Sequence, residues 1–281
     1  MIRFISSGKG LILLMLLITL SGLFMYFHRA GDQHFQGGPG RSPGAAEDHY
    51  PQYLLPEGRI PAVNESEGEQ AGDKVAYLTF DDGPSENTEA VLDILKEYDI
   101  KATFFVNGRE GPFAVRMYRR MVEEGHAIGN HTYSHNYRQI YRSVDSFFAD
   151  LEKLENYLFE VAEVRPKIIR FPGGSTNTVS RSVAGKDIMH DLMQLVQDKG
   201  YIYVDWNVCA FDGYRPAPGP STIMLNVLGQ SENRRVPVIL LHDSEISPTT
   251  PEALPGMIEG LHQMGFRFKV ITPEAGIIKF W

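Results

Sequence analysis

The sequence predicts an α/β fold, a distorted (β/α) barrel of about seven parallel strands with its functional site at the carboxyl ends of the strands. Short apolar runs alternate with segments of helical periodicity from residue 74 onward. Such alternation is typical of parallel strands covered by helices. Side chains suited to catalysis follow directly after several of the apolar runs. A short barrel and an open sheet share these features, and we expect the barrel.

Each predicted strand is a short apolar run, and each predicted helix carries apolar residues at helical spacing. The strands are expected at 75–80, 102–106, 168–171, 201–205, 237–241 and 268–271. The helices are expected at about 87–98, 112–124, 145–162, 187–199, 220–229 and 252–264. Between Val91 and Leu95, and again between Phe147 and Leu154, apolar residues recur with the period of an α-helix.

The N-terminal part of the chain predicts export and attachment to a membrane. Residues 11–27 are almost wholly apolar and uncharged, and Arg3 and Lys9 precede them. The length of this run, with no Ala-x-Ala site after it, favours an uncleaved signal anchor with its N-terminus inside; a cleaved signal is the alternative. The following stretch is rich in Gly, Pro, Glu, Gln and Ser, which predicts a flexible linker. The expected order is a signal anchor at 1–29, a linker at 30–72 and a catalytic domain at 73–281, outside the cytoplasmic membrane.

Composition excludes several classes of function. The net charge is −8, so the chain lacks the basic footprint of a nucleic-acid-binding protein. It has neither a Gly-x-Gly-x-x-Gly sequence after a strand nor a Walker loop, so we expect no nucleotide cofactor. The single cysteine, Cys209, excludes an internal disulfide and a cysteine zinc cluster. We expect it to be a small buried hydrophobic residue.

Two carboxylates and two imidazoles predict a metal centre. Asp81 and Asp82 end the first apolar run, and His131 and His135 follow about fifty residues later. Adjacent carboxylates can supply one metal ligand and one base, two roles that a single carboxylate cannot fill together. Imidazoles four residues apart can lie on one side of a helical turn and bind one ion. A site of two histidines and one carboxylate leaves room for water and substrate, which predicts metal-assisted hydrolysis.

The chain from about residue 74 to residue 281 resembles the polysaccharide deacetylase family, whose members carry the NodB-homology domain of carbohydrate esterase family 4. Five family motifs are recognisable in their usual order. They are Asp81-Asp82, His131-Thr132-Tyr133-Ser134-His135, Arg170-Phe171-Pro172-Gly173-Gly174, the segment from Trp206 to Gly213, and Leu240-Leu241-His242-Asp243. One such motif is weak evidence, whereas five together are specific.

The resemblance assigns roles to the first three motifs. It implies that Asp81 is the general base, and that Asp82, His131 and His135 are the metal ligands. Ligand softness favours zinc as the one divalent ion, and cobalt, manganese, nickel or iron suit the same ligands. Arg170 would hold Asp81 ionised and oriented.

The remaining motifs are implied to bind substrate and to protonate the leaving group. His242 would be the general acid, oriented by Asp212. The substrate-binding residues implied are Pro172, Gly173 with its backbone N–H in an oxyanion hole, Trp206 as a wall of the pocket, and Leu240 beside the acetyl methyl group. Many relatives have tyrosine where this chain has Gly173, and often tryptophan where it has Gly213.

Other polar and aromatic residues receive weaker expectations. Asp205 is expected to be structural or to support the site, and His126 is expected to cap or pack. The tyrosines of residues 133–142 can form a sugar-stacking face, but ordinary packing accounts for them equally well.

The expected function is removal of N-acetyl groups from a polysaccharide that contains N-acetylglucosamine. Export favours cell-wall peptidoglycan as the substrate. The alternatives are a chitooligosaccharide deacetylase, an O-acetyl xylan esterase and a catalytically inactive glycan-binding module. The expected partners are the glycan and, through the N-terminal helix, the membrane, with no nucleic acid.

Overall fold

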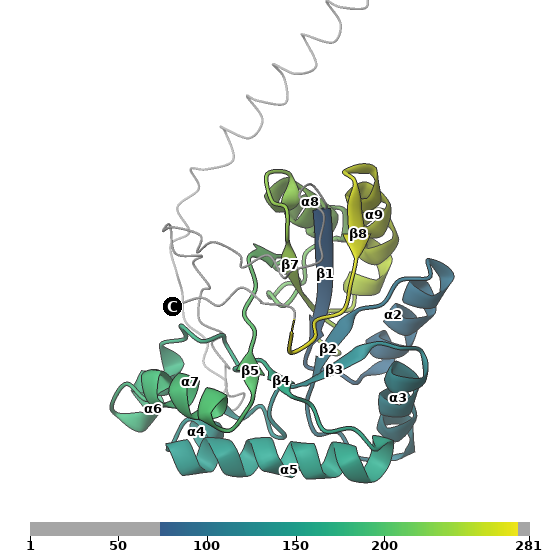
Figure 1. The fold of residues 1–281 in the computed structure, drawn as a ribbon. Coiled ribbons are helices and arrows are strands. Elements are labelled where there is room, and N and C mark those ends of the chain that lie inside the picture. Colours follow the sequence, from purple (N-terminus) through teal and green to yellow (C-terminus); the bar gives the residue numbers. More distant parts are fainter. Residues whose placement is uncertain (1–73, 275–281) are drawn as a thin grey trace, which may run out of the picture. The chain divides into compact units, whose positions relative to one another are not determined.

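Parallel strands form the centre of the structure, a computed structural model that describes residues 74–274 (Figure 1). The strands are β1 (Lys74–Asp81), β2 (Thr103–Val106), β3 (Ala127–Asn130), β4 (Ile168–Ile169), β5 (Ile202–Tyr203), β6 (Val208–Cys209), β7 (Val238–His242) and β8 (Phe266–Phe268). Seven of them lie in the order β5-β4-β3-β2-β1-β7-β6, and β8 also pairs with β1. All of these pairs are parallel. No pairing joins β5 to β6 within residues 74–274, so the expected barrel is present as an open half-barrel.

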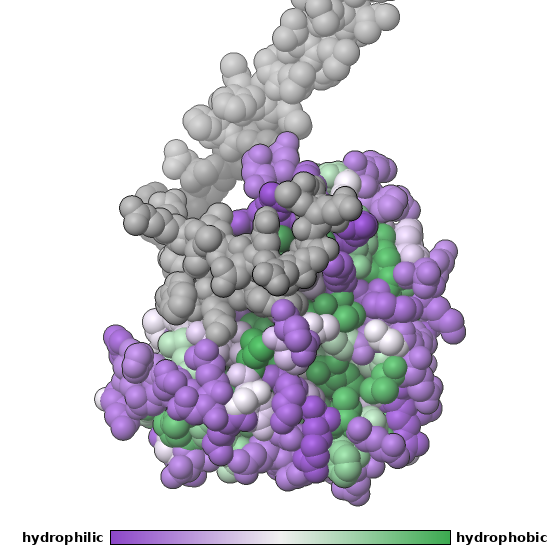
Figure 2. Space-filling model, viewed as in Figure 1, coloured by the Kyte–Doolittle hydropathy of each residue, from purple (hydrophilic) through white to green (hydrophobic). Residues whose placement is uncertain are grey.

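Helices surround the strands on their outer side (Figure 1). They are α2 (Glu86–Glu97), α3 (Pro112–Glu123), α4 (Tyr137–Ile140), α5 (Val144–Ala162), α6 (Val179–Ala184), α7 (Met189–Asp198), α8 (Pro220–Ser231) and α9 (Thr250–Gln263). Their outward faces on the side drawn in Figure 2 are mainly hydrophilic. The apolar residues of these helices face inward instead. In α2, for example, Val91, Leu92 and Leu95 lie at helical spacing and are all buried.

Strand β1 is the most enclosed strand and sets the register of the site. It pairs with β2, β7 and β8, and Leu78 and Phe80 within it are fully buried. At its carboxyl end, Asp81 lies opposite His242 of β7 and opposite Phe105 of β2. Parallel pairing therefore brings residues that are distant in sequence to one edge of the sheet.

The structure confirms the alternation of strands and helices and corrects it in detail. The short helices α4 and α6 were not expected. Strands β3 and β6 were not expected, because Ala-Ile-Gly-Asn and a run of only two residues give no clear apolar signal. The last strand is Phe266–Phe268 instead of 268–271. It pairs with Lys74–Ala76, and β2 pairs with β1 from Thr79 onward, so there is no room for β8 to continue.

The predicted signal anchor (1–29) and linker (30–72) lie outside the described residues. Within residues 74–274, every helix is too short or too polar to cross a membrane. Cys209 is free and buried, as expected, and burial raises the pKa of its thiol to about 12.

Core packing around β1 can be tested with a matched pair of substitutions. Leu78 is 0% exposed and Leu225 is 63% exposed. We expect Leu78→Ala to lower the free energy of unfolding by about 2–5 kcal/mol, because it leaves a cavity in the core. Leu225→Ala should change it by less than about 0.5 kcal/mol. Urea unfolding followed by circular dichroism measures both values, and equal effects would contradict the proposed core.

Candidate active site

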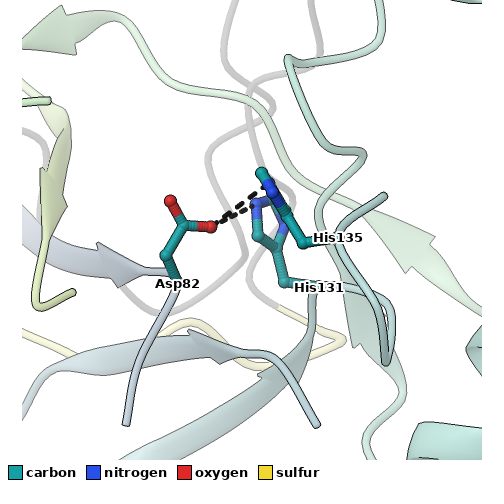
Figure 3. A group of neighbouring side chains, drawn as sticks. All are labelled: Asp82, His131 and His135. Atoms are coloured by element: carbon teal, nitrogen blue, oxygen red, sulfur yellow. Dashed lines mark ion pairs between the residues drawn. The ribbon is translucent and has the colours of Figure 1, made fainter. Parts of the chain in front are cut away.

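Three side chains form a candidate metal centre at the carboxyl edge of the sheet. One ligand atom from each of Asp82, His131 and His135 lies within 4.8 Å of the others. Figure 3 shows the Asp82 carboxylate pointing at both imidazoles, with Oδ1 at 3.2 Å from Nε2 of His135 and 3.5 Å from Nε2 of His131. This buried Oδ1 accepts no hydrogen bond from the described residues. A buried carboxylate oxygen that accepts no hydrogen bond and lies beside two imidazole nitrogens is suited to coordinate a divalent cation.

The ligands come from loops that follow strands. Asp82 has a φ of 74° directly after β1, and His135 has a φ of 50° in the loop after β3. The sequence is compatible with a loop or a short helical turn between His131 and His135, and the structure has a loop, because left-handed residues at Thr132 and His135 break any helix there. The side chain of Asn130 replaces helical hydrogen bonding, since its Oδ1 accepts from the Thr132 N–H at 2.9 Å.

Hydrogen bonding fixes the form in which His131 is presented. Its Nδ1 lies 2.7 Å from the carbonyl oxygen of Arg170, which can only accept, so Nδ1 carries the proton and Nε2 keeps its lone pair. Burial lowers the pKa of His131, which favours this neutral form. Burial would raise the pKa of Asp82, but the neighbouring His135 and His131 lower it below its usual value, so the carboxylate is ionised.

A buried arginine orients the second carboxylate of the pair. Nη1 of Arg170 donates to Oδ1 of Asp81 at 2.7 Å and to Oγ1 of Thr79 at 2.8 Å. The guanidinium also lies 4.1 Å from the ring centroid of Phe105. Arg170 thus lies beside Asp81, as the resemblance implied, and a charge-assisted hydrogen bond sets the direction of that carboxylate.

An aspartate–histidine pair lies on the neighbouring strand end. Nδ1 of His242 donates to Oδ1 of Asp212 at 2.8 Å, and the His242 backbone N–H donates to Oδ2 at 2.7 Å. Thr250 donates a further hydrogen bond to Oδ2. Burial would lower the pKa of His242, but the charge and hydrogen bond of Asp212 raise it to about 10. The imidazole is therefore protonated at neutral pH.

The loop after β4 presents a backbone donor. Gly173 has a φ of 79°, which favours glycine, and its N–H donates to no group within residues 74–274. A Cβ on Gly173 would lie 3.0 Å from the hydroxyl of Tyr137, so this tyrosine from α4 already occupies the adjacent space. The Tyr141 hydroxyl donates to the Pro172 carbonyl at 2.7 Å and helps to hold the loop.

The remaining implied substrate-binding residues are largely buried. Leu240 and Trp206 are 3% and 7% exposed and belong to one hydrophobic cluster. A Cβ on Gly213 would lie 3.1 Å from Cε1 of His242, so the glycine leaves room for the imidazole. Both departures from the motifs of the family thus have a local steric reason.

Sequence reasoning missed Asn107, which joins the two ligand loops. The Asn107 backbone N–H donates to the Gly83 carbonyl at 2.9 Å. Its side-chain amide donates to the carbonyls of His131 at 2.8 Å and Thr132 at 3.1 Å. A signal was present, since Asn107 is a polar residue directly after a predicted strand.

Two buried carboxylates also hold loops of the site. Asp150 accepts from the Ser134 N–H, and Asp205 accepts from the Ser175 N–H, both at 2.9 Å. Asp205 thus supports the loop after β4, in line with its expected role. His126 packs, as expected, because it accepts from the Ala102 N–H at 3.1 Å and burial lowers its pKa to about 4.

The fold and site together define a class of proteins, parallel half-barrels with a candidate metal centre beside an arginine–aspartate pair and an aspartate–histidine pair. Comparison with known families gives a match to polysaccharide deacetylase over residues 68–189. The chain is 34% identical to the putative polysaccharide deacetylase YheN of Bacillus subtilis over 203 residues, covering 71% of this chain and 68% of that protein. It is 30% identical to a peptidoglycan-N-acetylglucosamine deacetylase of Bacillus cereus over 213 residues, covering 74% and 73%.

Solved structures agree. The catalytic domain of peptidoglycan N-acetylglucosamine deacetylase from Eubacterium rectale superposes with a TM-score of 0.71 and 34% identity, covering 78% of this chain and 97% of that domain. The chain therefore belongs to the polysaccharide deacetylase family.

Metal binding is open to direct measurement. We expect the purified chain to retain about one equivalent of zinc after dialysis, and His131→Ala to lose it because one ligand is missing. His262→Ala is the matched control, since His262 is exposed on α9. Atomic absorption gives the metal content of each protein. Retention of zinc by the His131 variant would contradict the proposed centre.

Proposed function

We propose that this protein is a metal-dependent deacetylase that removes N-acetyl groups from N-acetylglucosamine-containing polysaccharide, with cell-wall peptidoglycan as the substrate. The observation that carries the proposal is that the Asp82–His131–His135 group, the Asp81–Arg170 pair and the Asp212–His242 pair all lie at the same sheet edge. The relatives named as peptidoglycan-N-acetylglucosamine deacetylases support this choice of substrate.

Asp82, His131 and His135 would hold the divalent ion, for which zinc is the proposal. When bound, such an ion supplies Lewis acidity toward a carbonyl oxygen and a water. Asp81 accepts a proton from the attacking water, since Arg170 fixes the direction of its carboxylate. The Gly173 N–H donates to the acetyl carbonyl oxygen as negative charge develops there.

His242 completes the reaction. As the water oxygen bonds to the acetyl carbon and the C–N bond breaks, protonated His242 gives its proton to the departing nitrogen. Asp212 stabilises the protonated form and holds the ring. The products are acetate and a glucosamine unit with a free amine.

The location is proposed from the N-terminal sequence. An apolar run at 11–27 after Arg3 and Lys9 supports an uncleaved signal anchor, and 30–72 supports a linker. The catalytic domain then acts outside the cytoplasmic membrane, where the cell wall lies.

Acetate release tests the proposal. We expect the purified chain with zinc to release acetate from peptidoglycan, and Asp81→Asn to lower kcat by about 100-fold or more, because the base is removed. Asp145→Asn, an exposed change of the same charge on α5, should have no effect. Release from acetylated xylan alone would indicate an ester substrate. Zinc binding without any release would favour a glycan-binding module instead.

The pH profile tests the role of Asp212. The raised pKa of His242, about 10, keeps the acid protonated at neutral pH, and activity is lost as the pH rises through that pKa. We expect Asp212→Asn to move the alkaline limb of kcat/KM to lower pH by about one unit or more. The pair also stabilises the fold fully below pH 6.5, and this contribution disappears as the pH rises toward 10. An unmoved alkaline limb would contradict the assignment.

A further inference from the structure

The loop after β2 begins with Asn107, Gly108 and Arg109 and lies between the two ligand loops of the candidate metal centre. Asn107 binds the Gly83 and His131 carbonyls, and the Gly108 N–H donates to the Tyr133 carbonyl at 2.9 Å. The next residue is Arg109, which is exposed. The position of Arg109 is therefore the rim of the proposed active site.

Hydrogen bonds hold the backbone of Arg109 in place, whereas no described residue pairs with its positive charge. The Arg109 N–H donates to the hydroxyl of Tyr118 at 2.9 Å, and its carbonyl accepts from the hydroxyl of Tyr157 at 2.9 Å. Tyr118 is fully buried. The guanidinium has no hydrogen-bond or ion-pair partner among the described residues. The adjacent carboxylate of Glu110 is bound by the hydroxyl of Tyr133 instead.

Arg109 supplies a positive charge at the rim of the candidate metal centre, two residues after Asn107, whose side chain binds the His131 carbonyl. The chain as a whole carries a net charge of −8, so its overall field does not attract an acidic polymer. Recognition of an acidic glycan by this protein therefore needs a local cation, and Arg109 is one at the site itself.

We propose that Arg109 binds a carboxylate of the glycan substrate and so selects acidic glycans over neutral ones. The planar guanidinium presents paired donors that match the two oxygens of a carboxylate. A backbone held by Tyr118 and Tyr157 reduces the entropy that is lost on binding. This inference rests on the proposed function. It identifies the carboxylate as the chemical group that is recognised near the N-acetyl group that is removed. In peptidoglycan the carboxylate has two sources, the lactyl ether of the sugar and the attached peptide.

Three substrates of equal length separate these sources. They are peptide-free glycan strands with free lactyl carboxylates, muropeptides in which only the peptide carboxylates are free, and neutral chitooligosaccharides. The variants are Arg109→Gln, Arg109→Lys and the control Arg116→Gln. Arg116 is exposed on α3 and lies 5.3 Å from the Phe113 ring centroid, so the control removes the same charge from the same part of the fold.

We expect Arg109→Gln to raise KM for acidic glycan about fivefold to tenfold, with kcat changed less than about twofold, since a hydrogen bond to a charged group is lost. KM for chitooligosaccharides should stay constant, Arg109→Lys should be intermediate, and Arg116→Gln should match the unmodified chain. An effect confined to peptide-free strands identifies the lactyl carboxylate, and one confined to muropeptides identifies the peptide. Added salt should weaken acidic-glycan turnover in the unmodified chain more than in Arg109→Gln.

Equal changes on acidic and neutral glycans, or no change on either, would overturn the inference while the proposed function stands. Absence of acetate release from all three substrates by the unmodified chain would overturn the proposed function itself. Thermal melting and zinc content show whether Arg109→Gln is folded. If it is not, Arg109→Lys decides, because a folded Lys variant without any loss on acidic glycan excludes paired recognition by the guanidinium.

Discussion

The site depends on one buried positive charge, the guanidinium of Arg170, whose side chain is 0% exposed. A buried cation is tolerated only when its donors are satisfied. Arg170 donates to Asp81 at the end of β1 and to the carbonyls of Val204 and Asp205 after β5, and its own carbonyl accepts from His131. These bonds hold the ends of separate strands in register, so Asp81 and the candidate metal ligand His131 are oriented by the same residue.

Around this charge, backbone conformations that are unfavourable alone are held by neighbouring groups. Asp82 and His135 have positive φ angles although neither is glycine. Asn107 joins the two loops that carry these ligands, and Asp150 binds the Ser134 N–H just before His135. Such conformations persist when the surrounding structure determines them, and they concentrate at functional sites. Neighbouring segments of the fold therefore hold the candidate ligands in these conformations.

The two groups proposed to transfer protons, Asp81 and His242, differ because their partners differ. Asp81 faces the guanidinium of Arg170, whereas His242 faces the buried carboxylate of Asp212. The guanidinium sets the direction of the Asp81 carboxylate, whereas Asp212 raises the pKa of His242 and keeps its imidazole protonated at neutral pH. Arg109 adds a positive charge at the rim, and its guanidinium has no partner among the described residues, so we propose a substrate carboxylate as its counterpart.

The sequence by itself determined the alternating architecture, the central strand at 75–80, most helices and the chemistry of the candidate ligands, because burial periodicity and residue type are local properties. It did not reveal β3, β6 or the bridging role of Asn107, and it left open whether residues 131–135 form a loop or a helical turn. Nor did it show that Tyr137 fills the space beside Gly173. Only the tertiary structure decided these features, because they depend on strand register and on hydrogen bonds between segments that pattern alone cannot place.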